Sequence, residues 1–285
     1  RRTFIVREGV VEMANGVFSP LYRFAHGLYQ EIVLEQMATR PRADAHARAG
    51  LAMERVFSGR EHEAAADLAC HFHGAADHLR AARYLRLAAG NALKRYAPRE
   101  AAALLYGAMT HLSHLTSSER ADTEYPLLFE LGQAQLAAGE TDLAIQTLGK
   151  LERRTSDERQ HDHRVRALIA LAEAHAGRSR EATLECARQV KVVAPLTSDA
   201  RLASMAVIRA GIIELHFEGW SDEIADRCFE AWRDLPRHVS NEQRSLAIRL
   251  LFLHHARSAY ASAWSAGRKL LPLALASGDL SDCVY

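Results

Sequence analysis

The chain has 285 residues with 36 basic and 35 acidic side chains, so its formal net charge is only +1. Hydrophobic residues make up 48% of the sequence and charged residues 25%, which is ordinary for a folded protein and argues against extensive disorder. The balanced charge disfavours direct nucleic-acid binding, because that needs excess positive charge against phosphates. Apolar stretches such as Ala203–Leu215 are too short to span a bilayer.

The four cysteines, at positions 70, 186, 228 and 283, lie far apart and form no CxxC pair. This spacing predicts buried thiols in a reducing compartment and neither a disulfide framework nor a zinc knuckle. The sequence starts with Arg1 and shows no signal peptide there. We therefore expect a cytoplasmic protein, and we interpret the chain as a piece of a larger one.

A β-hairpin is the first predicted element. Val10 and Val11 precede the dipeptide Asn15-Gly16, and a second apolar segment, 21–24, follows it. Asn-Gly between two apolar segments is a strong hairpin signal.

Helical periodicity begins after the hairpin and continues to the end of the chain. Pro98 suits the first turn of a helix, whereas Pro272 should kink or shorten the last one. The predicted helices lie at 25–38, 41–56, 61–73, 77–94, 98–114, 126–138, 141–153, 162–176, 179–193, 199–217, 221–234, 241–257 and 259–276.

A repeat of helix pairs is visible from residue 131 onward. Small residues at 132, 170 and 211 should mark close helix crossings, and Gly139, Gly177 and Gly219 should end the first helix of each pair. These glycines are 38 and 42 residues apart, whereas a regular tetratricopeptide repeat has about 34 residues. The sequence therefore predicts an all-α, divergent tetratricopeptide-like helical-hairpin superhelix with a small β-hairpin near its N-terminus.

Motifs for catalysis and cofactors are missing from the sequence. There is no P-loop, GxGxxG, GxSxG or HExxH segment. We therefore expect no enzyme activity and no cofactor in this chain. A site built from dispersed histidines and acids would be the alternative, but no spacing supports it.

Two histidine-containing segments resemble metal motifs at first sight. In Cys70-His71-Phe72-His73, helical neighbours point about 100° apart, so we expect Cys70 to be buried and the histidines to lie at the surface or against neighbours. His161-Asp162-His163 is interpreted as a linker with Asp162 as an N-cap. No metal site is predicted. The tryptophans, at 220, 232 and 264, are predicted to fill the core, with a groove wall as the alternative.

Polar residues on otherwise apolar first helices are candidates for lining a concave groove that binds a ligand or partner. The alternative is that they simply face solvent. These residues are Gln133, Gln135, Glu173, His175, Arg209 and Glu214.

The segment Tyr22–Ile32 reads YRFAHGLYQEI. It resembles the YRFxHxLxxE segment that follows the ATPase core of large bacterial STAND-type regulators, the MalT-like and adenylate-cyclase-associated predicted ATPases. The segments 42–53, 64–72, 75–89 and 99–105 are similar to the next helices of that family, in the same order. The resemblance covers about Val10 to Leu115.

This resemblance implies three regions: 1–38 as the end of a winged-helix-like element with the hairpin as its wing, 39–115 as a helical linker or arm, and 116–285 as the repeat domain. It makes Tyr22, Phe24 and His26 a structural signature that holds the first region against the following helices. ATP and magnesium would bind upstream. The repeats would bind an inducer or partner protein, with homo-oligomers possible and no membrane or nucleic-acid contact. The alternative is a stand-alone tetratricopeptide-type interaction scaffold.

Overall fold

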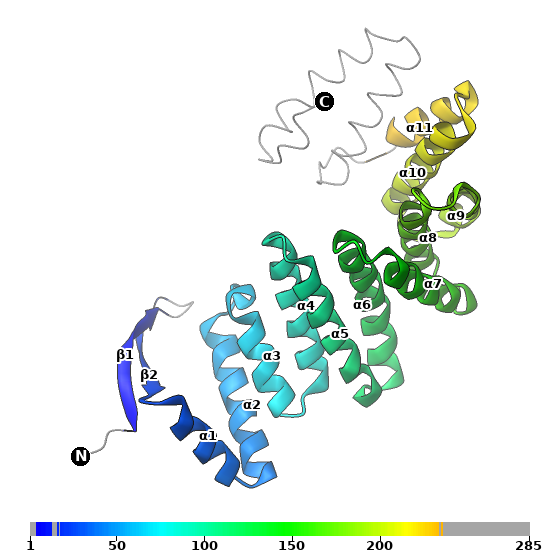
Figure 1. Ribbon diagram of the computed structural model, residues 1–285. Helices are drawn as coiled ribbons and strands as arrows, with labels where there is room; N and C mark the ends of the chain where they lie inside the picture. The colour runs from blue at the N-terminus through cyan, green and yellow to red at the C-terminus, as the bar shows by residue number, and fades with distance from the viewer. Residues whose placement is uncertain (1–3, 13–15, 17, 234, 236–285) are drawn as a thin grey trace. The chain divides into compact units, whose positions relative to one another are not determined.

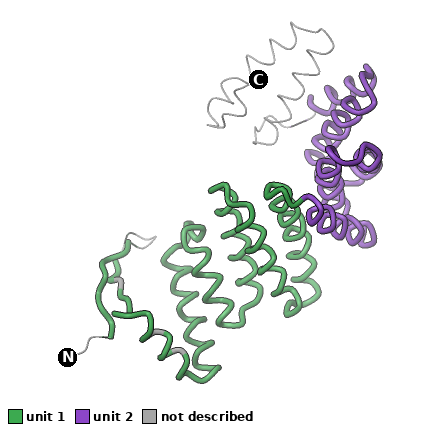
Figure 2. The backbone as a smooth tube through the Cα atoms, viewed as in Figure 1, with its two compact units in different colours: residues 1–140 green, residues 141–285 purple. Residues whose placement is uncertain are grey.

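A computed structural model describes residues 4–12, 16, 18–233 and 235 of the chain. It divides into two compact units, residues 1–140 and residues 141–285 (Figure 2). The predicted helices 241–257 and 259–276, with Trp264 and Cys283, lie outside the described residues. The predicted ranges 1–38, 39–115 and 116–285 follow a different division and stay predictions.

The N-terminal hairpin is confirmed. Strand β1 (Ile5–Glu12) pairs antiparallel with β2 (Phe18–Phe24), from Ile5 opposite Phe24 to Glu12 opposite Phe18. Gly16 in the connection has a φ of 77°, as the predicted turn requires. Helix α1 (Gly27–Gln36) follows β2 directly.

The helices of unit 1 pack in chain order, each against the next from α2 to α6 (Figure 1). Buried alanines and leucines of α4, α5 and α6 form one cluster, and Phe72 stacks on Tyr84 in another with ring centroids 5.6 Å apart. The bounds are α2 (Thr39–Val56), the 3-10 helix η1 (Glu61–Ala64), α3 (Ala65–Gly74), α4 (His78–Lys94), α5 (Pro98–Thr110), the 3-10 helix η2 (His111–His114) and α6 (Ser117–Ala137).

Helix α6 corrects one predicted boundary. We expected a helix to begin at Pro126, but α6 begins at Ser117 and contains Pro126. A capping box starts it, because Thr116 accepts from the Glu119 N–H and Glu119 accepts from the Thr116 N–H. Burial of Tyr125 and its neighbours then stabilises the helix through the proline.

Unit 2 continues the same pattern of consecutive, packed helices. Gly211 lies where α10 crosses α11, since a Cβ there would meet the Cys228 Sγ at 2.4 Å. The predicted close crossing at Gly211 is therefore confirmed. The bounds are α7 (Thr141–Asp157), α8 (His161–His175), α9 (Arg180–Val193), the 3-10 helix η3 (Ala194–Leu196), α10 (Ala200–Glu218) and α11 (Asp222–Arg233).

Four turns share one hydrogen-bond pattern at helix C-termini. After α3, the Asp77 N–H donates to the Phe72 carbonyl and the Ala76 N–H to the His73 carbonyl, a Schellman motif. The turns at 92–97, 135–140 and 155–160 repeat this pattern. The left-handed residue is Ala76, Tyr96, Gly139 or Arg159, with φ from 56° to 78°. The turns are therefore defined by the backbone and only once by glycine.

Candidate binding cleft

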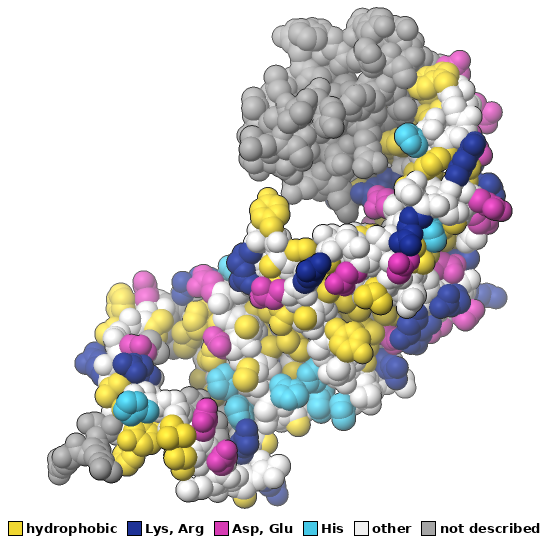
Figure 3. All heavy atoms as spheres, in the orientation of Figure 1, with side chains coloured by type: hydrophobic (Ala, Val, Ile, Leu, Met, Phe, Trp, Pro, Cys, Tyr) yellow, Lys and Arg dark blue, Asp and Glu magenta, His cyan; other side chains and the backbone are white. Residues whose placement is uncertain are grey.

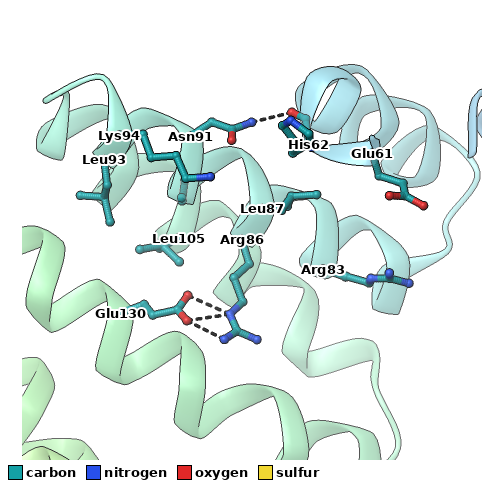
Figure 4. Close-up of a pocket in the computed structure, with 12 residues that line it drawn as sticks. Glu61, His62, Arg83, Arg86, Leu87, Asn91, Leu93, Lys94, Leu105 and Glu130 are labelled. Atoms are coloured by element: carbon teal, nitrogen blue, oxygen red, sulfur yellow. Dashed lines mark hydrogen bonds and ion pairs between the residues drawn. The ribbon is translucent and has the colours of Figure 1, made fainter. Parts of the chain in front are cut away.

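An open cleft of about 640 Å³ runs along α4 in unit 1, between η1 on one side and α6 on the other (Figure 4). A volume in this range suits a ligand site. Helix α4 contributes most of the surface, and η1, α5 and α6 contribute the rest. The lining residues are Glu61, His62, Arg83, Arg86, Leu87, Ala89, Gly90, Asn91, Leu93, Lys94, Leu105 and Glu130.

The sequence of α4 determines which side chains face the cleft. Its small residues and Tyr84 are buried against α3 and α5, so the arginines and lysine between them project from the opposite face. Asp77 caps the helix by accepting from the Arg80 N–H at 3.1 Å.

Two polar contacts connect α4 to both walls of the cleft, and Figure 4 shows both. The Arg86 guanidinium donates to both carboxylate oxygens of Glu130 on α6, at 2.5 to 2.9 Å. This hydrogen bonding raises the pKa of Arg86. Because the Arg86 guanidinium pairs with the Glu130 carboxylate, their charges largely neutralise each other. The second contact joins α4 to η1, where Asn91 Nδ2 donates to the His62 carbonyl at 2.5 Å.

The cleft combines an apolar lining with a charged rim. Leu87 is half-buried, and Leu93 is 37% exposed. Lys94 is exposed, and no carboxylate among the described residues lies within ion-pair distance of it. Apolar anchors beside an unpaired cation suit recognition of a polypeptide segment.

The predicted groove residues fall in both units. Gln133 and Gln135 belong to unit 1, and the other four belong to unit 2. The structure joins one pair: Arg209 Nη1 lies 3.1 Å from Glu173 Oε1, between α10 and α8. Their role in a groove stays a prediction.

Two of the predicted groove residues are buried. Gln135 is 8% exposed, and its Oε1 has no hydrogen-bond partner among the described residues. Glu214 is 3% exposed and forms ion pairs with Lys191 and, at 4.0 Å, with Arg227. It lines a small cavity of about 160 Å³ in unit 2. His175 and Gln133 are half-buried.

The family-signature residues lie on the hairpin and just after it. Tyr22 is 59% exposed, Phe24 is half-buried, and the exposed His26 ring lies 5.6 Å from that of Tyr29, measured between centroids.

Three predictions from residue type were wrong. Cys70 is exposed, because α3 buries positions 65, 68, 69 and 72 and turns position 70 outward. Asp162 is not an N-cap: α8 begins at His161 after Gln160, and Asp162 accepts from the Ser198 N–H and hydroxyl. Trp220 is 42% exposed.

Other predictions from residue type are confirmed. Trp232 packs against a buried cluster of unit 2. Cys228 is buried, and burial raises the pKa of its thiol to about 11. His71 and His73 contact the neighbouring rings of His46 and His111.

Sequence reasoning missed the cleft altogether. Arg86 and Glu130 are 44 residues apart, and each resembles an ordinary solvated side chain on its own helix. The missed signal was the cluster of basic residues on one face of α4. Within the described part of the chain, no three histidine, cysteine or acidic side chains converge as a metal ion would require. None of the helices described there is long and apolar enough to cross a bilayer.

Several solved structures resemble this chain, among them BtubC, NprR and RapI. BtubC from P. vanneervenii matches 86% of this chain and 94% of its own, with a TM-score of 0.56 and 12% identity. NprR in complex with its cognate peptide NprX matches 87% of this chain and 72% of its own, with a TM-score of 0.54 and 13% identity.

Apo RapI matches 72% of this chain, with a TM-score of 0.53 and 13% identity, and the match spans just over half, 56%, of RapI. The chain has the tetratricopeptide-like helical-repeat fold. No protein-family model and no curated protein sequence matches it. At these identities the likeness concerns the fold alone.

Proposed function

We propose that this chain is a non-catalytic regulatory or sensor module that binds an inducer or partner protein through its helical repeats. The observation that carries this proposal is the cleft on α4, with apolar side chains beside a charged rim. The likeness in fold to NprR, a protein solved with its cognate peptide, supports a peptide as the occupant.

The chemistry of the cleft favours an acidic peptide that carries apolar side chains. Leu87 and Leu93 offer apolar contacts. Arg86 is already engaged by Glu130, so the exposed Lys94 and Arg83 are the lining cations available to a ligand carboxylate. A charge-assisted contact of this kind fixes orientation and specificity.

The finer proposal places this module in a STAND-type signalling ATPase or transcriptional regulator, as the segment Tyr22–Ile32 suggests. Its support is a set of exposed apolar side chains on the hairpin and α1, which is expected where another element packs. We propose that this element is the rest of a winged-helix-like domain, with ATP and magnesium bound further upstream and the protein cytoplasmic. The exposed apolar residues are Phe4, Ile5, Val10, Phe18, Tyr22, Leu28, Ile32 and Val33.

Peptide binding is tested by selecting short random peptides on phage against the whole chain, and then measuring their affinity by fluorescence polarisation. We expect acidic peptides with apolar side chains, and a loss of affinity of about tenfold or more (~1.4 kcal/mol) in Lys94→Glu and in Leu93→Asp. Arg188→Glu, on the exposed surface of α9, is the matched control and should bind normally. Equal affinities for all these variants would place the peptide elsewhere and refute the cleft.

The STAND context has its own test, which does not depend on the cleft. Sequencing the reading frame upstream of Arg1 should show a strand, a GxxxxGK[ST] loop and a helix. A nearby start codon without that segment would refute the STAND proposal and favour the stand-alone interaction scaffold.

A further inference from the structure

Six of the eight histidines of unit 1 gather in one cluster. They come from four elements of the unit, and Figure 3 shows histidine side chains gathered on one face of this unit. The histidine cluster comprises His46 on α2, His71 and His73 on α3, His78 at the start of α4, and His111 and His114 on η2.

Two pairs within the histidine cluster face each other through their Nδ1 atoms. The Nδ1 atoms of His46 and His71 are 3.2 Å apart, and those of His78 and His111 are 2.9 Å apart. A hydrogen bond at this distance needs one Nδ1 as donor and the other as acceptor. If both rings of a pair are fully protonated, two N–H groups and two positive charges face each other. Each pair is therefore stable only while at most one of its rings is charged.

Ring contacts add His73 and His114 to the pair formed by His78 and His111, while His46 and His71 form a separate contact. The His73 ring meets His111 edge to face at 5.2 Å, and His78 stacks on His114 with centroids 4.0 Å apart. His111 lies in the middle of these contacts and is only 4% exposed. A proton added to one ring therefore places its charge within a few ångströms of two or three others.

The charged side chains around the histidine cluster do little to offset positive charge on its rings. Arg42 on α2 adds positive charge near His46. Asp77 attracts a proton at His78, but it already pairs with Arg80 at 3.0 Å. Glu119 of α6 is engaged in its capping box. Burial first and the neighbouring histidines next lower the pKa of the three most constrained rings, which are His46, His78 and His111.

We propose that the histidine cluster is a pH-sensitive latch, which holds α2 against α3 and α4 against η2 when neutral and releases them when protonated. The direction of the pH effect follows from the linkage between proton binding and opening. Rings that are harder to protonate when folded bind more protons after opening, so acid favours opening. The latch is fully closed above the ordinary histidine pKa of about 6.5 and is lost as pH falls through the lower pKa values of the folded rings.

A metal site is the competing interpretation of the two pairs. Two nitrogens each about 2.0–2.1 Å from one zinc ion also lie about 3 Å apart. Among the described residues, however, no third donor converges on either pair. Each pair is already satisfied by its own hydrogen bond. The geometry therefore favours the latch, and metal binding becomes an outcome of the test.

The test follows urea unfolding and amide hydrogen exchange of the whole chain from about pH 8 to about pH 5, in the presence of EDTA. The equilibrium constant for opening should rise about tenfold for each unit by which the pH falls and for each proton taken up on opening. Up to three such protons are expected from His46, His78 and His111, the cluster rings of lowered pKa. Protection should fall in peptides from α2, α3 and α4, while peptides from α10 serve as the internal reference.

The double variant His78→Asn, His111→Asn keeps an amide group near each Nδ1 but cannot titrate, so its pH slope should drop by up to two protons. His62→Asn, an exposed histidine of η1 outside the cluster, is the matched control. An unchanged slope in the double variant would overturn the latch. So would zinc chloride, in place of EDTA, stabilising the wild type but not the double variant.

If the double variant does not fold, a measurement on the wild-type protein tests the same proposal. Ring titration of the wild-type protein by NMR should place His46, His78 and His111 below about 6.5. Values at or above that would refute the latch directly.

Discussion

The contact between α10 and α11 gives a sharp prediction, because a helical glycine there faces a sulfur atom. In Gly211→Ala, the new Cβ would lie 2.4 Å from the Cys228 Sγ and 3.3 Å from the Ile224 Cγ2. A contact at 2.4 Å forces the two helices apart or twists the cysteine. Replacing Cys228 with alanine as well removes the atom responsible.

Two opposing terms set the magnitude. Alanine favours the helix over glycine by about 1 kcal/mol, whereas overpacking a core typically costs about 1–3 kcal/mol. Gly211→Ala should therefore lower the free energy of unfolding by up to about 2 kcal/mol. In the Cys228→Ala background the same change should be neutral or stabilising by up to about 1 kcal/mol, which gives a coupling of about 1–3 kcal/mol.

Urea unfolding followed by tryptophan fluorescence measures this cycle, since Trp232 packs against the cluster that contains Cys228. Gly149→Ala on α7 is the matched control, because its Cβ would meet only the Arg153 Nη1 at an ordinary 3.5 Å. That change should stabilise by about 0.5–1 kcal/mol. Equal effects of Gly211→Ala with and without the Cys228 sulfur would refute the close packing of these helices.

Two further predictions concern unit 1. Thr116→Ala should lower the free energy of unfolding by about 1 kcal/mol through loss of the capping box, and circular dichroism during urea unfolding would show it; no loss would mean that α6 does not begin there. Tyr84 donates to Glu54 Oε1 at 2.6 Å, and burial, followed by this bond, raises its pKa from 10 to about 12. Wild-type stability from this group should therefore be complete below about pH 10 and fall as pH rises toward about 12, a loss that Tyr84→Phe should not show in alkaline unfolding curves.

The local elements were predictable because their causes lie close together in the sequence. The dipeptide Asn15-Gly16 predicted the hairpin, and Pro98 predicted the start of α5. The capping box at Thr116 and Glu119 was also present in the sequence, and it marks the start of α6 that the predicted boundary at 126 missed. Cys70 was misjudged from its residue type, although the spacing of the buried positions on α3 already turned it outward.

The sites depend on contacts that a single sequence does not specify. His46 and His71 are 25 residues apart, and His78 and His111 are 33 residues apart. Taken alone, each has the pattern of a solvated or core histidine. Only the packing of α2, α3, α4 and η2 brings their Nδ1 atoms together, and the same holds for the cleft between η1 and α6.

The Schellman turns have a consequence for how this architecture can change over evolutionary time. Tyr96 follows Ala76 by 20 residues, and Arg159 follows Gly139 by the same 20. Main-chain hydrogen bonds define each of these turns, whether or not its left-handed residue is a glycine. A residue with a Cβ in the left-handed conformation costs only about 1–2 kcal/mol. A lineage can lose its turn glycines one at a time and recover the stability elsewhere. The helix–turn–helix geometry of the repeat can therefore persist after its turn glycines have been replaced.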